Sequence, residues 1–538
     1  MSKSQYCIEY NTVTCHCNLD PFFQSKSYKH CNIITMPPRV AGTPESKKVT
    51  CDYLVVGAGT SGMSFVDTIL TENPKATIVV VDRNSQPGGH WTTAYPWVRL
   101  HQPSCCYGIN SMQLGKTKKR GYERYDVEDL ATGAEILEYY KRALETFEAT
   151  GRVRSFFDAS YVYDKDTGNH SIVTSTQNEN ENGITSTSSS STSIIKVECQ
   201  KVVAVKTNVT VPSMRDPLIP VDPEVNFVPV NSISESIISG KFQNYIVFGN
   251  GKTGCDAVVH LINSGVDPSQ ISWVSPRDVW YFNREGLADF YKTFDVLKKM
   301  VDVKSMEEAF LSFEKDGLLH RIDPTRPFPE VFKGPCMTTN EMKQMRDVRN
   351  IVRMGRATAI EAGKVILQEG TLDFTTEDTL LVDCMVNNLY GWDFDKDFTI
   401  FEPTKINLGP YLSLFNASMS AAQIAFLETK LKDDGSKNQK CYFLRGKEYA
   451  SSDSGCLIGY IYMGLKSAEA IMKMKGGAKF FMTSRCNSQS PKHFKGGWWK
   501  FMWKGFGMAS FGKGLTKKIE SNGYSDIDHC WGVESFWQ

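Results

Sequence analysis

The sequence predicts an α/β protein with two Rossmann-like dinucleotide-binding domains and a helical elaboration toward its C-terminus. Two separate segments each carry a hydrophobic run, a glycine-rich turn, a helical stretch and a second hydrophobic run, the order of a βαβ unit. The length fits this division, because 538 residues exceed what one hydrophobic core usually organises.

Composition narrows the functional classes. The chain has 61 Lys and Arg against 60 Asp and Glu, a net charge of +1, so no global charge favours nucleic acid or an anionic membrane. No apolar run approaches the ~20 residues that span a bilayer. The 15 cysteines lack paired zinc-ligand spacing and fit a reducing compartment. We therefore expect a cytoplasmic protein without a metal site and without nucleic-acid partners.

The first βαβ unit begins with the apolar run Tyr53–Val56, continues through a helix over Ser61–Leu70 and ends with a strand over Thr77–Val81. Its turn has the G-x-G-x-x-G spacing that brings a pyrophosphate to a helix N-terminus, and an acid at the end of the second strand can accept hydrogen bonds from a ribose. The residues expected to bind a dinucleotide here are Gly57, Gly59, Thr60, Ser61, Gly62, Asp82 and Arg83.

The second unit has strands at Tyr245–Phe248 and Ile271–Val274. Its strand end reads Ser-Pro-Arg and lacks a carboxylate, and the arginine can fork to a ribose 2′-phosphate, which favours NADPH over NADH. Arg277 could instead pack on Trp280 at the surface, and Lys252 could hold phosphate or only be solvated. The residues expected to bind NADPH are Gly249, Gly251, Lys252, Thr253, Gly254 and Arg277.

A third segment, Gly88-Gly89-His90-Trp91, follows the first unit. With the two glycine motifs it resembles the flavin-containing monooxygenase and Baeyer–Villiger monooxygenase superfamily over about Asp52–Arg284. The resemblance implies that the first motif binds FAD, with Gly89, His90 and Trp91 near it, and that the second binds NADPH. It further implies hydride transfer from NADPH to FAD, followed by transfer of one atom of molecular oxygen to a small organic substrate.

The segments VRLHQPS (98–104), PRDVW (276–280) and SAAQIAF (420–426) look like a less studied branch of that superfamily. This resemblance implies that His101 and Gln102 lie near the flavin ring as catalytic residues. A neutral histidine there could donate a hydrogen bond or move a proton, although a structural histidine in a packed loop is an equal alternative.

The sequence departs from the superfamily pattern between the two glycine motifs. The monooxygenase fingerprint FxGxxxHxxx(W/Y/F) is replaced by Phe227–Ile233, which lacks both the glycine and the histidine, and Lys206–Asn208 replaces an ATG turn. The departure favours one alternative, a flavin oxidase or dehydrogenase that uses the same cofactors and inserts no oxygen. A non-catalytic redox-sensing flavoprotein is a further alternative, of a different functional class. A disulfide reductase using Cys105 and Cys106 is a weaker alternative, because redox dithiols usually have a two-residue spacer.

Further elements complete the expected map. We expect helices over Glu135–Thr150, Thr339–Arg353 and Ser418–Leu431, and a strand over Thr379–Val382. The aromatic, lysine-rich C-terminal segment is expected to fold against the protein, with membrane-surface contact as the alternative. Met36 is an alternative to Met1 as the functional start. The expected organisation is a disordered leader (1–50), the first part of the FAD domain (51–235, with a disordered insertion at about 177–193), an NADPH domain (236–375), completion of the FAD domain with substrate-side helices (376–490), and the tail (491–538).

Overall fold

The computed structural model describes residues 48–115, 127–176, 191–205, 211–287, 295–299, 302–329, 331–385, 397–413, 416–443, 456–487, 490, 513–514 and 517. The expected leader as far as residue 47, residues 177–190 of the expected insertion, the Lys206–Asn208 segment and nearly all of the tail lie outside these residues. Among the described helices, none has the length and apolar character needed to cross a membrane.

The first domain is built on an eight-stranded sheet with the path β18-β19-β6-β1-β2-β3. Neighbours from β19 to β3 run parallel, while β5 pairs antiparallel with β6 and with β4. The strands are β1 (Lys48–Val56), β2 (Ile78–Val81), β3 (Val153–Phe156), β4 (Ala159–Asp164), β5 (Asn169–Thr176), β6 (Ser191–Ala204), β18 (Phe401–Glu402) and β19 (Lys405–Asn407).

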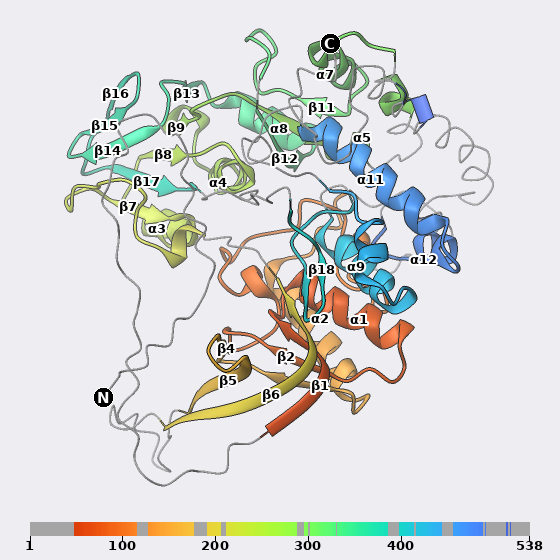
Figure 1. Cartoon of the computed structure of the whole chain (residues 1–538). Coiled ribbons are helices and arrows are strands. Elements are labelled where there is room, and N and C mark those ends of the chain that lie inside the picture. Colours follow the sequence, from red (N-terminus) through yellow and green to blue (C-terminus); the bar gives the residue numbers. More distant parts are fainter. Residues whose placement is uncertain are drawn as a thin grey trace.

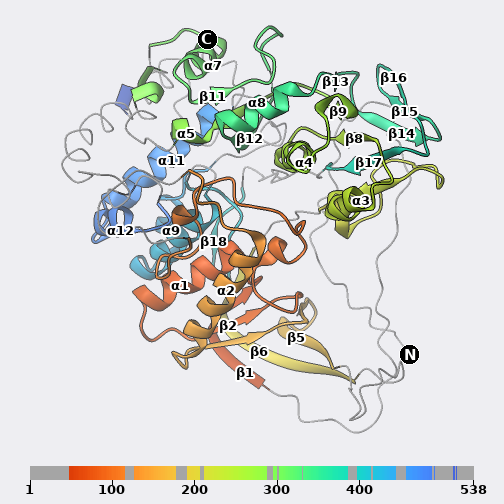
Figure 2. The ribbon, with the colours of Figure 1, turned by 180° about the vertical axis from the view of Figure 1, so that it is seen from behind.

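The main helices described in this domain are α1 (Thr60–Glu72), α2 (Gly133–Glu148) and α9 (Ala417–Lys430). Figures 1 and 2 both place α9 beside α1, although more than 300 residues separate them in the sequence. The Ser64 hydroxyl donates a hydrogen bond of 2.7 Å to the Ser418 carbonyl, which ties the two helices together. These C-terminal segments therefore pack with the sheet and helix of the first βαβ unit.

The second domain contains a five-stranded, fully parallel sheet in the order β13-β9-β8-β17-β7. A small antiparallel sheet, β14-β15-β16, lies beside it (Figure 1). The elements are β7 (Phe227–Pro229), α3 (Ile233–Ser239), β8 (Asn244–Phe248), α4 (Lys252–Asn263), β9 (Ile271–Val274), α8 (Thr339–Asp347), β13 (Asn350–Val352), β14 (Ala357–Glu361), β15 (Lys364–Leu367), β16 (Gly370–Asp373) and β17 (Thr379–Asp383).

A third cluster joins the second domain to the C-terminal helices. The strands β10, β11 and β12 form a separate sheet, and Trp280, Phe310 and Tyr460 share one buried core. Figure 1 shows α11 running from near α5 toward α12. The elements are β10 (Val279–Asn283), α5 (Arg284–Leu287), α7 (Met306–Lys315), β11 (Leu319–His320), β12 (Val331–Met337), α10 (Asp434–Asn438, in the first domain beside β18), α11 (Cys456–Met472) and α12 (Gly477–Thr483).

The α/β class and the two βαβ units are confirmed, but several boundaries differ. Both β7 and β17 lie outside the predicted range 236–375 and still join the second sheet, because Leu381 and Val382 pair with β7 on one side and with β8 on the other. The range for this domain is therefore too narrow. Two predicted disordered ranges also overlap strands: Lys48–Thr50 pair with β6, and Ser191–Ser193 pair with β5.

The helix expected over Thr339–Arg353 is too long. Helix α8 begins at a capping box, in which the Thr338 hydroxyl and the Glu341 carboxylate bind each other's backbone N–H groups, and it ends at Asp347. The next residues form β13, which pairs in parallel with β9. The predicted helix extends too far because apolar residues at Ile351 and Val352 fit both the helical and the strand pattern. Only the pairing with β9 shows that these residues form a strand.

Candidate functional site

The first glycine loop has a geometry that only glycine satisfies at two positions. Gly57 has φ = +109°, a left-handed conformation that L-residues rarely adopt. A Cβ at Gly62 would lie 1.9 Å from the Gly57 carbonyl oxygen, so any side chain would push α1 away from the loop. Gly89 crosses the loop so closely that its own Cβ would lie 2.9 Å from the Gly59 Cα. The GGHW segment is therefore packed onto the first motif.

Asp82 lies at the end of β2, where the sequence predicts it, and is only 7% exposed. Its Oδ2 accepts a 2.6 Å hydrogen bond from the Ala58 N–H inside the glycine loop. Its Oδ1 accepts hydrogen bonds of 2.8 and 2.9 Å from the backbone and side-chain amides of Asn84. The carboxylate thus shapes the loop itself, and its role with a ribose stays a prediction. Arg83, next to it, is exposed.

A tyrosine network surrounds the N-terminus of α1. The Thr60 hydroxyl is hydrogen-bonded to the hydroxyls of Tyr107 and Tyr140, the latter at 2.8 Å. Trp91 of the GGHW segment donates its ring N–H to the Tyr107 oxygen at 2.6 Å. Burial raises the pKa of Tyr107, so its phenol stays neutral. Sequence reasoning missed both tyrosines, since their partner Thr60 lies 47 and 80 residues away and no motif contains them.

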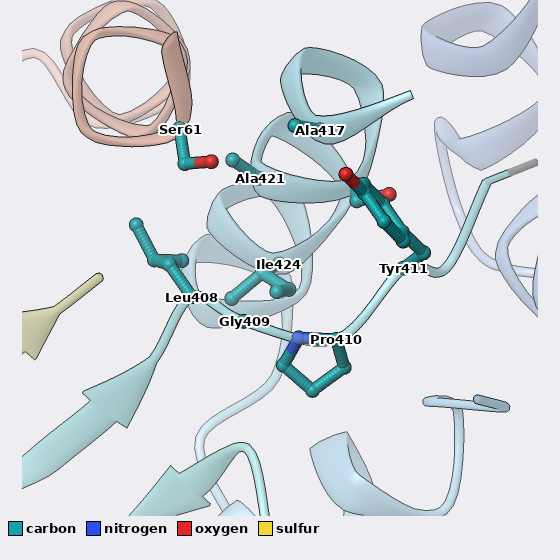
Figure 3. A pocket seen from close by; sticks show the side chains of 9 residues that line it. Ser61, Leu408, Gly409, Pro410, Tyr411, Ala417, Ala421 and Ile424 are labelled. Atoms are coloured by element: carbon teal, nitrogen blue, oxygen red, sulfur yellow. The ribbon is translucent and has the colours of Figure 1, made fainter. Parts of the chain in front are cut away.

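A pocket opens beside this helix terminus. Figure 3 shows Ser61 at one side of the pocket and Tyr411 at the other, with Ala421 of α9 between them. Ser420 fixes the pocket wall, because its hydroxyl oxygen accepts 3.1 Å hydrogen bonds from the N–H groups of Leu412 and Ser413. The complete lining is Ser61, Leu408, Gly409, Pro410, Tyr411, Ala417, Ser420, Ala421 and Ile424.

The second glycine loop repeats the geometry of the first. Gly249 has φ = +106°, and a Cβ at Gly254 would lie 1.9 Å from the Gly249 carbonyl oxygen. A Cβ at Gly251 would meet nothing within 4 Å, so the protein's own packing does not require glycine there. Asn250 holds the loop against the end of β9 through a 2.7 Å hydrogen bond to the Ser275 hydroxyl.

Lys252 forms an ion pair with Asp256 one turn along α4, and it is only 21% exposed, which excludes the alternative of a fully solvated turn residue in this structure. Thr253, the next residue, is half-buried. Asp256 also accepts a 2.5 Å hydrogen bond from the Tyr95 hydroxyl of the first domain. The first turn of the second motif is thereby tied to the segment that follows GGHW.

Arg277 is exposed beyond the end of β9, as a contact to a 2′-phosphate requires. The sequence left open that Arg277 packs on Trp280. The cation that lies over the Trp280 ring is Arg321, whose guanidinium carbon is 5.1 Å from the ring centroid. The neighbouring Asp278 carboxylate is paired with Arg353 at 2.9 Å. Sequence reasoning missed Arg353, which reaches Asp278 only because β13 lies next to β9.

His101 lies at the junction of the two domains. Its Nδ1 is buried and has no hydrogen-bond partner among the described residues. Burial, assisted by the positive charges of Lys252 and Arg284, lowers the pKa of His101 to about 3, so the ring is neutral near pH 7. Gln102 is half-buried beside it, and His90 is exposed, with its ring 4.8 Å from that of Trp91.

Arg284 is a second residue that sequence reasoning missed as a site residue. It is 2% exposed, donates a 3.2 Å hydrogen bond to the His101 carbonyl, and forms a 3.1 Å ion pair with Glu341. Its Nη1 has no partner among the described residues. The junction therefore joins a neutral histidine from the first domain to a buried guanidinium from the second.

Comparison with known proteins gives matches in sequence and matches in structure. No protein-family model matches the chain. The uncharacterized protein Rv2000 of Mycobacterium tuberculosis is 33% identical over 415 residues, which cover 75% of this chain and 72% of that protein. A solved structure of cyclohexanone monooxygenase with bound ε-caprolactone matches with a TM-score of 0.47 and 14% identity, over 80% of this chain and 98% of that one. A steroid monooxygenase bound to NADP matches with a TM-score of 0.45 and 13% identity, over 71% and 85%.

Proposed function

The chain belongs to the family of the uncharacterized Mycobacterium tuberculosis protein Rv2000, and we propose that it is an FAD- and NADPH-dependent oxidoreductase of the flavin monooxygenase type. The observation that carries the proposal is the junction: the segment following GGHW in the first domain contacts helix α4, which follows the second glycine loop, through Tyr95 and Asp256. Two dinucleotide-binding domains in contact at this junction suit electron transfer between two bound cofactors.

The first loop fits the pyrophosphate of FAD. Gly57 makes the turn, Gly62 allows α1 to start against the loop, and the helix N-terminus supplies N–H groups and a partial positive charge. The pocket between Ser61 and Tyr411 lies beside that terminus, where the flavin half of the cofactor would continue. Asp82 would meet the adenosine ribose while it holds the Ala58 N–H.

The second loop fits the pyrophosphate of NADPH. The space beside Gly251 is open for a close backbone approach, and the exposed Arg277 would form a fork to the 2′-phosphate. Lys252 would contribute positive charge to the phosphates only if its ion pair with Asp256 loosens or is shared.

Bound together, the two cofactors supply hydride transfer and the activation of molecular oxygen. The protein's own contribution at the junction is electrostatic. His101, kept neutral, would accept or donate a hydrogen bond through Nδ1, and Gln102 would offer its amide to the same site. Arg284 would stabilise negative charge that develops between the domains, because a buried guanidinium acts in a low-dielectric surrounding.

The alternative, an oxidase or dehydrogenase acting without oxygen insertion, has its own support. The segment that replaces the monooxygenase fingerprint begins with β7, the edge strand of the second sheet, and has neither the glycine nor the histidine. The chain therefore lacks residues that the superfamily uses to hold NADP over the reactive flavin.

The test measures how much of the NADPH oxidised yields oxygenated product and how much yields hydrogen peroxide. Purified protein is assayed for bound flavin, reduced anaerobically with NADPH or NADH, and mixed with oxygen in the presence of small ketone and sulfide substrates. Oxygenated product formed with less than stoichiometric hydrogen peroxide supports the monooxygenase. Peroxide equal to the NADPH consumed supports the oxidase, and the absence of bound flavin or of NADPH oxidation above the free-flavin rate refutes the proposal in favour of a non-catalytic protein.

A further inference from the structure

Cys105 and Cys106 form a pair of adjacent thiols in a single turn that spans Ser104–Cys106. Their sulfur atoms are 3.7 Å apart. Cys106 is buried, at 4% exposure, whereas Cys105 is half-buried. A partly exposed cysteine next to a second cysteine is an arrangement typical of a peroxide-sensing thiol with its resolving partner.

The surroundings of Cys105 favour its thiolate. The hydrogen bond from the Cys106 thiol and the nearby Arg485 guanidinium lower the pKa of Cys105. Other described cysteines show the reverse: burial raises the pKa of Cys199 to about 11 and that of Cys486 to about 12. Because the thiolate is the nucleophile, Cys105 is expected to react faster than these thiols.

The turn is also tied to the first glycine helix. Arg485 donates hydrogen bonds of 2.6 Å to the Cys105 carbonyl and 2.7 Å to the Tyr107 carbonyl. The Tyr107 hydroxyl, at the other end of that residue, contacts Thr60 in the loop expected to hold FAD. A change in the turn therefore reaches that loop through one residue.

We propose that Cys105 and Cys106 are a hydroperoxide-reactive dithiol that closes into a vicinal disulfide. The Cys105 thiolate attacks one peroxide oxygen, so that an S–O bond forms, the O–O bond breaks and the other oxygen leaves as water after protonation. The Cys106 thiol then attacks the Cys105 sulfur, an S–S bond forms, the S–O bond breaks and a second water leaves. Two thiols lose two electrons and two protons, and one hydrogen peroxide becomes two waters.

Closing the disulfide must move the peptide between the two residues, because that planar unit is part of the small ring. Its carbonyl is held by Arg485, and the Cys106 N–H is held by the Pro103 carbonyl at 3.0 Å. Oxidation is therefore expected to weaken the Arg485 contact and to shift Tyr107. The inference rests on the proposed function only for the source of peroxide at the site, which flavin turnover would supply.

The experiment uses the full chain, reduced, desalted and exposed to a small molar excess of hydrogen peroxide. At intervals the free thiols are alkylated, and the masses of the proteolytic peptides are measured by mass spectrometry. We expect the peptide containing both cysteines to lose two hydrogens, to recover them with dithiothreitol, and to react about tenfold or more faster than Cys199, the half-exposed control. In Cys106→Ser we expect a sulfenic acid at Cys105 that dimedone traps, whereas Cys199→Ser should behave as the wild type. Equal rates at Cys105 and Cys199, or a link from Cys105 to another cysteine, would overturn the proposal.

A second measurement keeps the proposal testable if Cys106→Ser does not fold. Phenylarsine oxide, which bridges two close thiols without oxidising them, should protect both cysteines of the native wild-type chain from alkylation. No protection would overturn the proposal. Both measurements are repeated on flavin-free protein, in which the dithiol should react in the same way. A failure to bind flavin would therefore refute the proposed function without changing the result for the dithiol.

Discussion

Gly251→Ala separates the ligand-binding role of a glycine from its structural role. The third glycine of each loop is required by the protein's own packing, since a Cβ at Gly254 would lie 1.9 Å from a backbone oxygen. At Gly251 a Cβ would meet nothing within 4 Å, and φ is −78°, which alanine adopts easily. Any large effect of the added methyl group on NADP⁺ affinity must therefore come from contact with the bound ligand.

The magnitudes follow from this geometry. Alanine is a poorer helix cap than glycine, so we expect the free energy of unfolding to fall by no more than about 1 kcal/mol. A pyrophosphate oxygen bound by the loop N–H groups at about 2.9 Å would be in contact with the new Cβ, and displacing it weakens one charge-assisted hydrogen bond by about 1.5–3 kcal/mol. We expect the Kd for NADP⁺ to rise roughly 10- to 150-fold.

The assay is a calorimetric titration with NADP⁺, which binds without reducing the flavin, together with urea unfolding of each variant. Gly435→Ala is the matched control, because its Cβ would make only ordinary contacts of 3.5–3.9 Å with Asp433 in the first domain. An unchanged Kd in a folded Gly251→Ala protein would show that no pyrophosphate approaches this residue, and the assignment of the second loop would be wrong.

Three further predictions concern single residues. Arg277→Ala should raise the KM for NADPH about tenfold and leave that for NADH unchanged, whereas the exposed Arg356→Ala should alter neither; equal effects on both nucleotides would exclude the 2′-phosphate contact. Gly62→Ala should abolish FAD binding and destabilise the first domain by about 1–3 kcal/mol, because the 1.9 Å clash is with backbone; a variant that retains flavin in absorbance spectra would contradict this. Because the pKa of His101 is lowered to about 3, the unfolded chain binds a proton at His101 below about pH 6.5, whereas the folded chain binds it only near pH 3. The contribution of the neutral His101 to the free energy of unfolding is therefore fully present above about pH 6.5 and is lost as the pH falls from about 6.5 to about 3. With a discount for partial exposure, urea unfolding at pH 5 and 7 should show about 1 kcal/mol less loss in His101→Gln than in the wild type; an equal loss would mean that His101 is not the titrating group.

Most features of the fold that the sequence predicts follow from patterns within short segments. Both βαβ units appear where the apolar runs and glycines predict them, because strand and helix periodicities and a turn that tolerates φ > 0 are properties of short segments. The helix predicted over Ser418–Leu431 agrees with α9 to within one residue at each end. The sequence pattern predicts α8 and β13 as one helix, because the apolar residues after Asp347 fit both the helical and the strand period.

The candidate site divides in the same way. The sequence by itself determined the two glycine loops and the position of Asp82, because each lies within about 25 residues of its own strand and helix. Only the tertiary structure brought Tyr107 and Tyr140 to Thr60, Arg284 to His101, and β17 into the second sheet. These contacts join segments from 47 to 183 residues apart. Which distant side chains meet is decided by packing of the whole core, and local pattern carries no information about that choice.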